Sequence, residues 1–539
     1  MAVGALTRLW IADDGLINVR IVDNVLAGQG PTFTSGIRAE TGTSAVWLAV
    51  MSIGSAVPGL GADTVAVAGG LLLTLAGIAL GCASIHRARP EAGVVVPLGL
   101  LGYASYSYAW DFASGGLENG AVTCWLGGLA WELGREARSH RAVVGLGLLI
   151  GLGPLLRPDL AVVSVVLLLA VTPRRRRWPW VDPRLVAAAA LLPVASVVLR
   201  AAYFASLVPA AGLAKEGTSL RFAQGLSYGV TSLAPGGLAI VAGIAVALEV
   251  ARSHPDRLAR VVPARSAALA LAGALHLAYV VAVGGDFMRG RLLLPGLFAL
   301  ALSVGGFVVP TGRVARRVVV VVAALVALLA VAGPTFRDPW VVDERDYYAE
   351  MAGDAHPISA ADHDGSPWAR GTEDLVTANP GSLIYMPGRG GTIRFVMPLS
   401  AEAAAEHSSV LVTSTLGIKG TLVDDDVAVL DPIGLADPVA AHARLVERGR
   451  PGHEKDLPPE WYVARFGDPD APVPDGVDPA GVAAARRALG CGDLATLVEA
   501  TTADLGPDRL VRNLLDAPRL TRFRFHPDPT TAAAELCPG

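Results

Sequence analysis

Long apolar segments, separated by loops that alternate in basic charge, restrict the possible folds of this chain more than any other feature. Between residues 64 and 335 most of these segments approach the ~20 residues, or ~17 at the short end, that a helix needs to cross a bilayer. Ten spans are predicted, over 64–84, 93–110, 117–134, 141–156, 159–173, 184–204, 235–251, 265–284, 292–310 and 318–335. A further apolar stretch, 43–58, is short and contains Gly54 and Pro58, so we expect an interfacial helix there. The pattern predicts a polytopic α-helical membrane protein.

The basic residues predict which side of the membrane each loop faces. They gather in alternate loops, at 86–90, 135–141, 174–177, 252–265 and 312–317. Short loops with an excess of Lys and Arg stay in the cytoplasm. The intervening loops, and everything after residue 335, are therefore predicted to lie outside the cell.

The chain becomes polar after residue 335. The whole sequence has 17% charged residues and a mean hydropathy of +0.48, whereas 336–539 is rich in Asp, Pro and His. That segment is long enough for a core of its own, and its short apolar runs between Gly and Asp turns predict strands beside helices. We expect a transmembrane domain over 1–335, with an external loop and juxtamembrane helices over 10–62 and the spans over 64–335. A soluble extracytoplasmic α+β domain is expected over 336–539.

Charge and cysteine content exclude some functions. The net charge of −4, without a clustered basic face in the polar part, argues against a nucleic-acid partner. The sequence has no CxxC or Cys/His cluster that would indicate a metal site. Cys82 and Cys124 fall in apolar segments, where cysteine acts as a small hydrophobic residue. Cys491 and Cys537 are expected to form a disulfide if the end of the chain is extracellular.

Two adjacent carboxylates, Asp13 and Asp14, precede every predicted span. The following "LINVRIVDNVLA" predicts a helix, which "GQGP" ends, so the structural role open to either acid is a helix N-cap. A cap uses one carboxylate, and two side by side repel, which favours a functional role for the pair. If 43–58 does not cross the membrane, both acids lie outside. We then expect that a further transmembrane helix belongs ahead of them and that this chain lacks it.

Several motifs resemble those of C-type glycosyltransferases that use lipid-linked sugars, and more closely the terminal β-(1→2) arabinofuranosyltransferases of the mycobacterial cell wall. They are "WIADDGLINVR" (10–20), "NVLAGQGPTF" (24–33), "WDFASGGLEN" (110–119), "LLRPDLA" (155–161), "LVPAAGLAK" (207–215), "GGDFMRGRLLLP" (284–295), "VVDERDYYAEMAGDAHPISAADH" (341–363), "IGLADPVAAH" (433–442) and "GHEKDLPPEWYVAR" (452–465). The family has a span before the Asp-Asp pair, which matches the helix expected there. Gly115 replaces a family serine, and the changed loop 36–44 bears on contacts with the acceptor.

The resemblance implies a multi-pass plasma-membrane enzyme that transfers D-arabinofuranose from decaprenylphosphoryl-β-D-arabinofuranose to the 2-hydroxyl of terminal arabinose in arabinan. The departing lipid phosphate needs cations, and the attacking hydroxyl needs a carboxylate base. The expected catalytic groups are Asp13 and Asp14. Contacts to the donor phosphate or sugar are expected from Arg157, Lys215, Asp286, Arg289, Arg291 and Glu118, and acceptor or supporting contacts from His356, His453 and Trp461. Each of these cations could instead lie at the end of a membrane helix, with its charge reaching the membrane surface. Trp461 could instead pack in the core of the soluble domain.

Other possibilities stay open at this point. The resemblance implies no cofactor, although a divalent cation is compatible with it. A β donor giving a β product requires net retention, by a covalent sugar intermediate or by attack on the face of the leaving group. A transporter or flippase of a lipid-linked sugar, a structural scaffold, and a C-type enzyme with another pentose or hexose donor are the alternative functions. The paired acids, the large outer domain and the lack of an inverted repeat favour the enzyme.

Overall fold

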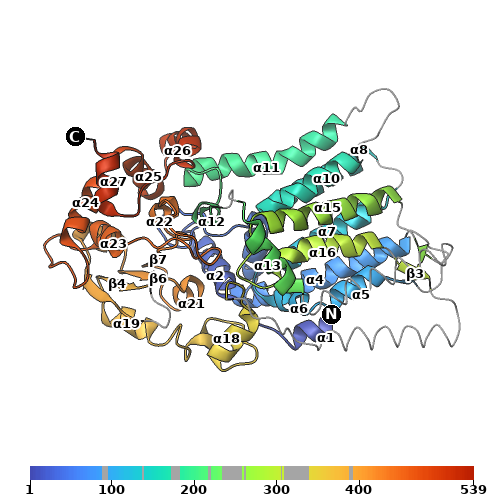
Figure 1. The fold of residues 1–539 in the computed structure, drawn as a ribbon, viewed down its shortest axis with the longest axis horizontal. Coiled ribbons are helices and arrows are strands. Elements are labelled where there is room, and N and C mark those ends of the chain that lie inside the picture. Colours follow the sequence, from blue (N-terminus) through green and yellow to red (C-terminus); the bar gives the residue numbers. More distant parts are fainter. Residues whose placement is uncertain are drawn as a thin grey trace.

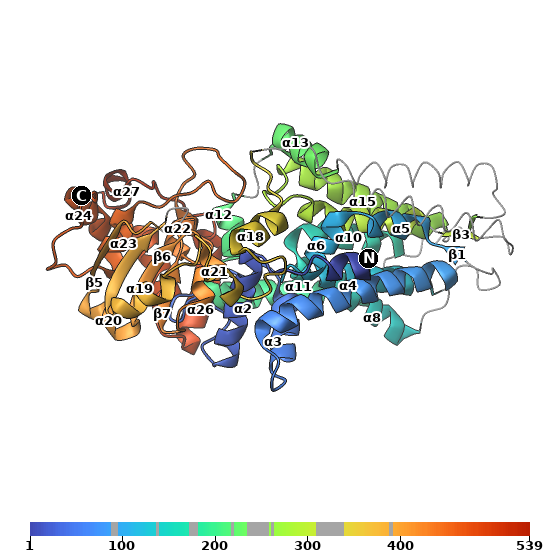
Figure 2. The same ribbon diagram turned by 90° about the horizontal axis from the view of Figure 1, so that it is seen from below.

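Helices that run side by side form one half of the molecule, and a domain built around a sheet covers one end of them (Figures 1 and 2). The computed structural model describes residues 1–87, 95–135, 139–171, 182–216, 220–233, 258–259, 263–304, 306–308, 339–387 and 392–538. The chain leaves the helical bundle and then builds the domain at its end, which we call the C-terminal domain (339–538).

Three helices among the described residues are long and apolar enough to cross a membrane. They are α4 (Ala62–Arg87), α11 (Pro183–Phe204) and α15 (Pro263–Ala282). Each falls on a predicted span, and together they make this a membrane protein. Shorter apolar helices accompany them, namely α3 (Ala45–Ser55), α7 (Asn119–Leu133), α8 (His140–Gly151), α9 (Gly153–Leu156), α10 (Ala161–Val171) and α16 (Leu294–Val304).

The prediction of one continuous span over 93–110 is wrong. The described part of it contains β1 (Val95–Val96) and α5 (Leu98–Ala104), and α6 (Ser107–Ser114) follows. At the end of α5 the Ser105 hydroxyl donates to the Gly102 carbonyl at 2.7 Å. Segments 235–251 and 318–335 lie outside the described residues, so the count of ten spans stays a prediction.

Glycines let α4 and α7 approach at backbone distance. A Cβ atom on Gly120 would collide with the Gly70 carbonyl, and one on Gly127 would collide with the Gly77 carbonyl. Small residues in membrane helices allow such close packing where lipid provides no hydrophobic drive for association. The α4–α7 pair is therefore a close backbone-to-backbone contact within the bundle.

Helix α2 (Asp13–Leu26) joins the start of the chain to the C-terminal domain. The buried Arg20 guanidinium donates to the carbonyls of Gly420, Val423, Asp424 and Val427. The N-cap is Ala12, without a side-chain bond, so neither aspartate caps the helix. Gly28 and Gly30, with φ of 78° and 95°, follow its last turn as the sequence predicts.

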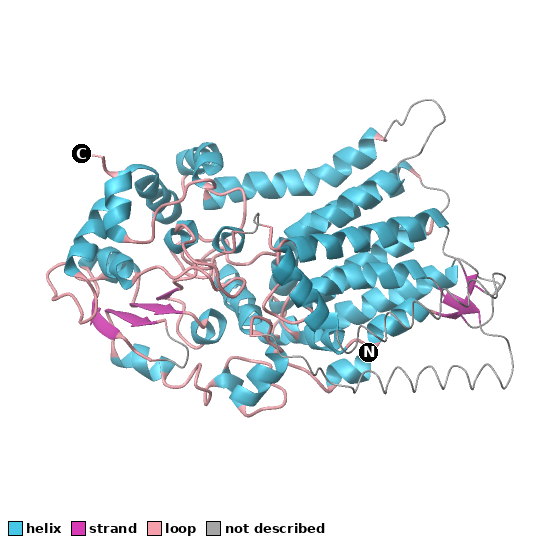
Figure 3. Ribbon diagram, in the orientation of Figure 1, coloured by secondary structure: helices cyan, strands magenta, loops and turns pink. Residues whose placement is uncertain are grey.

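The C-terminal domain contains a four-stranded sheet in the order β5-β4-β6-β7 (Figure 3). The strands are β4 (Ser382–Met386), β5 (Phe395–Pro398), β6 (Ser409–Thr413) and β7 (Val427–Leu430), of which β4, β6 and β7 are parallel and β5 is antiparallel. All four lie where the sequence predicts strands. A small sheet of β1, β2 (Leu258–Ala259) and β3 (Gly306–Val308), which was not predicted, lies at the opposite end of the bundle.

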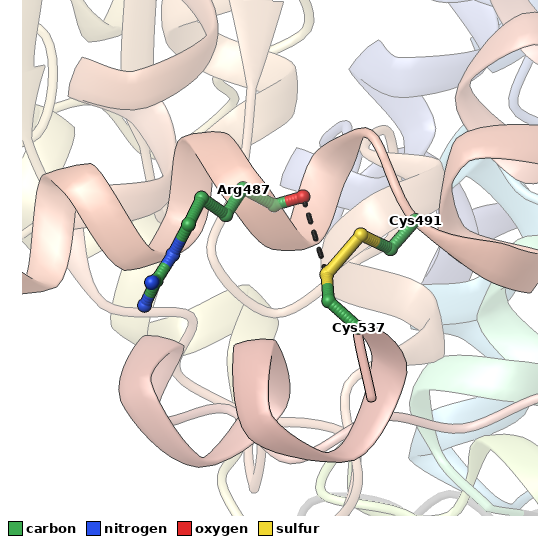
Figure 4. Close-up of a disulfide and its surroundings, with 3 residues drawn as sticks. All are labelled: Arg487, Cys491 and Cys537. Carbon is green, nitrogen blue, oxygen red and sulfur yellow. Dashed lines mark hydrogen bonds between the residues drawn. A yellow bond between two sulfur atoms is a disulfide. The ribbon is translucent and has the colours of Figure 1, made fainter. Parts of the chain in front are cut away.

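Ten described α-helices accompany the larger sheet in the C-terminal domain. They are α18 (Glu344–Ala352), α19 (Thr372–Ala378), α20 (Ala401–Glu406), α21 (Leu416–Thr421), α22 (Pro438–His442), α23 (Pro459–Phe466), α24 (Pro479–Leu489), α25 (Gly492–Thr502), α26 (Pro507–Leu520) and α27 (Pro529–Leu536). A disulfide joins Cys491, before α25, to Cys537, after α27 (Figure 4). It closes a loop across 46 positions, which restricts the unfolded chain.

Candidate active site

A cavity lies where the helical bundle meets the C-terminal domain. It holds about 740 Å³ of empty space, including the solvent at its mouth. The bundle and the segments before it provide Asp13, Asp14, Ile17, Asn18, Thr41, Thr43, Leu117, Glu118, Ala211, Lys215, Phe287 and Arg291. The C-terminal domain provides Ser414, Leu416, Asp431, Ile433, Leu435, Gly452 and His453. Segments more than 400 positions apart thus share one polar cavity.

The sheet faces this cavity with the carboxyl ends of two parallel strands. Ser414 directly follows β6, and Asp431 directly follows β7. The Asp431 carboxylate accepts hydrogen bonds of 2.7 to 2.9 Å from the backbone N–H groups of Gly434, Leu435 and Ala436. Burial raises the pKa of Asp431 to about 6, against these bonds. The position matches the rule that α/β sheets bind ligands beyond the carboxyl ends of their strands.

Asp13 is held directly by the C-terminal domain. Its Oδ1 accepts a hydrogen bond of 2.7 Å from the backbone N–H of Ile418 in α21. A Cβ atom on Gly417 would collide with the Asp13 carbonyl, so glycine is needed for α2 and α21 to meet this closely. Burial raises the pKa of Asp13 to about 7, and the adjacent Asp14 adds to this, while the Ile418 N–H lowers it. A carboxyl group that titrates near neutrality is suited to accept a proton.

Arg291 lies among three carboxylates. Its nitrogens are 3.4 Å from Asp14 Oδ2, 3.5 Å from Glu118 Oε1 and 3.6 Å from Asp286 Oδ2. Arg157 continues the network behind the cavity, at 3.3 Å from Glu118 and 3.0 Å from Asp159. The charge of Arg291 is therefore already compensated by protein groups, and the side chain fixes the position of Asp14 and Glu118.

Lys215 projects a less compensated charge into the cavity. Its Nζ lies 5.8 Å from the centroid of the Phe287 ring, and among the described residues it forms no ion pair with a carboxylate. Arg450 lies over the same ring at 4.6 Å, and the His453 ring meets it edge-on at 4.6 Å. Burial and the nearby Arg450 lower the pKa of His453 to about 4, so this imidazole is neutral at neutral pH. Lys215 is consequently the cavity cation best placed to bind an added anion.

The structure brings together only part of the predicted site. Asp13, Asp14, Glu118, Lys215, Arg291 and His453 line the cavity, whereas Arg157, Asp286, Arg289, His356 and Trp461 do not. Asp286 accepts from the Phe287 N–H, and Arg289 reaches toward the Val341 carbonyl at 3.5 Å. His356 is exposed beside the Leu9 carbonyl.

Trp461 lies inside the C-terminal domain, away from the cavity. Its side chain is fully buried, donates to the Pro527 carbonyl at 2.8 Å and packs on the Phe525 ring at 5.0 Å. A contact between Trp461 and an acceptor is therefore not supported. Its surroundings are those of a side chain packed in the core of the C-terminal domain.

Sequence reasoning missed several cavity groups. Ser414 and Asp431 fall within two stretches that the sequence predicts as strands, whereas the structure ends β6 and β7 directly before them. Phe287 lies inside a quoted motif, but only the structure shows the cations around its ring. Lys419 is buried beside Asp13, and burial lowers its pKa to about 8 while the Asp13 charge opposes this. In the described part of the chain, no group of three or more His, Cys, Asp or Glu residues is arranged to hold a metal ion.

Comparison with known proteins identifies the family. Residues 394–533 match the family model described as the AftB family C-terminal domain. The chain is 31% identical, over an alignment of 593 residues, to the terminal β-(1→2)-arabinofuranosyltransferase of Mycobacterium tuberculosis, covering 97% of this chain and 93% of that protein. It is also 31% identical over 570 residues to the Corynebacterium glutamicum protein of the same name, covering 94% and 82%. No solved structure matches. Since the similarity extends over almost the whole chain, the protein belongs to the terminal β-(1→2)-arabinofuranosyltransferase family and is a membrane glycosyltransferase.

Proposed function

We propose that the protein transfers D-arabinofuranose from decaprenylphosphoryl-β-D-arabinofuranose to the 2-hydroxyl of a terminal arabinose in cell-wall arabinan, as found in arabinogalactan and lipoarabinomannan. The similarity to two terminal β-(1→2)-arabinofuranosyltransferases supports the reaction class. The observation that carries the proposal is the shared cavity, which places the carboxyl group of Asp13 and the ammonium group of Lys215 around one space.

Asp13 is proposed as the base that accepts the proton of the attacking hydroxyl. Its pKa of about 7 allows it to accept a proton near neutral pH and to release it afterwards. Asp14 is less suited, because its carboxylate is already 3.4 Å from the Arg291 guanidinium. Net retention then follows either from a covalent sugar intermediate or from attack on the face that the phosphate leaves.

Lys215 is proposed to bind the phosphate of the donor. As the lipid phosphate departs, a cation within hydrogen-bond distance stabilises the developing charge. Arg291 contributes less to this step, since three carboxylates surround it. Its proposed role is to hold Asp14 and Glu118 at the wall of the cavity.

The outside of the plasma membrane is the proposed location of the cavity and of the C-terminal domain. The alternating basic loops support this orientation. The disulfide between Cys491 and Cys537 supports it independently, because disulfides persist in oxidising compartments and are rare in the cytosol.

A labelling experiment tests the orientation. In a chain with Cys82 and Cys124 replaced by alanine, a cysteine in place of the exposed Ala404 should react with a membrane-impermeant maleimide in right-side-out vesicles. Inside-out vesicles should react only after detergent is added. The opposite pattern would place the C-terminal domain in the cytoplasm and overturn the proposed location.

The reaction is tested with the purified full chain, a synthetic decaprenylphosphoryl arabinose and an arabinan oligosaccharide. We expect decaprenyl phosphate and an acceptor extended by a β-(1→2) arabinose. Movement of the intact donor lipid across vesicles without release of decaprenyl phosphate would instead identify a flippase. Turnover only with another lipid-linked sugar would correct the donor.

In the same assay, replacing Lys215 with alanine should lower kcat/KM by about 10- to 150-fold. This range corresponds to the ~1.5–3 kcal/mol of a hydrogen bond to a charged group. Lys215→Arg, which keeps a cation, should retain more activity. The control is Arg444→Ala, which removes an exposed ion pair with Glu535 and should not change kcat/KM. An unchanged Lys215→Ala enzyme would remove this residue from donor binding.

A further inference from the structure

Helix α26 turns its apolar face away from the domain that carries it. Leu510, Val511, Leu514 and Leu515 are 37%, 57%, 38% and 73% exposed. Their spacing of three to four positions places them on one side of the helix. The opposite side, with Arg509, Asn513, Ala517 and Leu520, is buried. In an ordinary surface helix of a soluble domain the apolar stripe faces the core, so the arrangement here is reversed.

Polar bonds on the inner side fix this orientation. The Arg509 guanidinium pairs with the Glu499 carboxylate of α25. The Asn513 amide donates to the Ala500 carbonyl at 3.2 Å. Rotating the helix to bury its leucines would break both contacts. The Arg509 and Asn513 side chains would then have no equivalent partners. The outward apolar face is therefore built into the packing of α26 on α25.

The helix lies against the end of a membrane-spanning helix. Helix α26 contacts α11, and the Thr521 hydroxyl just after α26 accepts from the Leu207 N–H just after α11, at 2.8 Å. Figure 1 shows α26 nearly end-on beside the end of α11, which lies along the long axis of the molecule. An axis that crosses a spanning helix at its end runs along the membrane surface.

Helix α11 also exposes large apolar side chains. Along α11, Leu191, Val194 and Leu199 are 58%, 59% and 69% exposed, as expected of side chains in contact with lipid. Exposed Arg512 and Arg522 accompany the apolar face of α26. A helix with one apolar face and neighbouring arginines is typical of the interface between water and acyl chains, where arginine meets anionic headgroups.

We propose that α26 is an interfacial helix, whose apolar face enters the headgroup region of the bilayer beside α11 and holds the C-terminal domain on the membrane. The apolar face would lie ~5–10 Å into the boundary between headgroups and acyl chains. The C-terminal domain would thereby stay over the bundle at the level where a lipid-linked donor presents its head. The proposal concerns lipid contact and does not depend on the sugar transferred.

The test measures the depth of single residues in the full chain. Cysteine replaces Leu515 in a chain without Cys82 and Cys124, is labelled with an environment-sensitive fluorophore, and is reconstituted into phosphatidylcholine–phosphatidylglycerol vesicles. Lipids with a spin label near the headgroup should quench the probe strongly, and aqueous iodide weakly. Ala404→Cys on α20, far from the bundle in Figure 2, is the matched exposed control and should show the reverse pattern.

Val511→Cys provides a second position on the same face, in case one labelled variant fails to fold. Iodide quenching of both probes equal to that of the Ala404→Cys control would show that α26 faces water and would overturn the proposal. Protection from iodide and from spin-labelled lipid alike would show that protein, such as a second copy of this chain, covers the face. That outcome would overturn the proposal too.

Discussion

Replacing Asp13 with asparagine will lower kcat by about 10²- to 10⁴-fold, the range expected when a positioned general base is lost. The variant should remain folded, because the asparagine oxygen can still accept the hydrogen bond that Ile418 N–H donates to Asp13. The substitution removes the charge and the ability to accept a proton, but little volume. Release of decaprenyl phosphate measures the rate, and thermal unfolding in detergent checks the fold.

The dependence of the transfer rate on pH tests the same role of Asp13. Burial raises the pKa of Asp13 to about 7, so below pH 7 the group is mostly protonated and cannot accept a proton. Activity of the natural protein should therefore rise with pH through about 7 and then level off. The residual activity of Asp13→Asn should lack this rise.

Asp14→Asn is the matched control, because Asp14 is the neighbouring carboxylate and pairs with Arg291. It should keep the rise near pH 7 even where its rate is lower. The assignment of the base would be reversed if Asp14→Asn lost the rise and Asp13→Asn kept it. Near-normal activity of both variants would exclude a base in this pair.

The elements that the sequence predicts well are those whose residues decide their own conformation. The long apolar runs of α4 and α11 need no other part of the chain to make them membrane helices. The four strands of the C-terminal sheet likewise follow from short apolar runs between turns. The break between α5 and α6 was missed, because hydropathy averages over a window and does not detect a local end of a helix.

The candidate site depends on contacts that no local pattern contains. The resemblance singled out Asp13, Lys215 and His453, and the structure places all three around one cavity. It did not predict that Ile418 would hold Asp13, since the two residues are about 400 positions apart. Trp461 lies in an equally specific motif, for which the sequence leaves an acceptor contact and core packing open, and the structure shows its side chain fully buried in the core.

Removing Arg291 should strongly lower the free energy of unfolding, because its guanidinium lies among the carboxylates of Asp14, Glu118 and Asp286. Arg291→Met keeps much of the side-chain volume but leaves these carboxylates facing one another. Breaking a buried ion pair in this way lowers the free energy of unfolding by about 3–5 kcal/mol. Thermal unfolding of the full chain should show this as a lower midpoint. Arg444→Met, at an exposed pair with Glu535, should change it by no more than about 1 kcal/mol.

A double variant separates charge compensation from donor binding by Arg291. If Arg291 mainly compensates carboxylates, adding Glu118→Gln to Arg291→Met should recover part of the lost stability, because one fewer charge is left unpaired. Donor binding by Arg291 would instead give a raised KM with an unchanged midpoint of unfolding, and the double variant would then be no more stable than the single one. Because three carboxylates surround this guanidinium, we expect the double variant to be more stable than Arg291→Met. Lys215 is then the cavity cation that binds the donor phosphate.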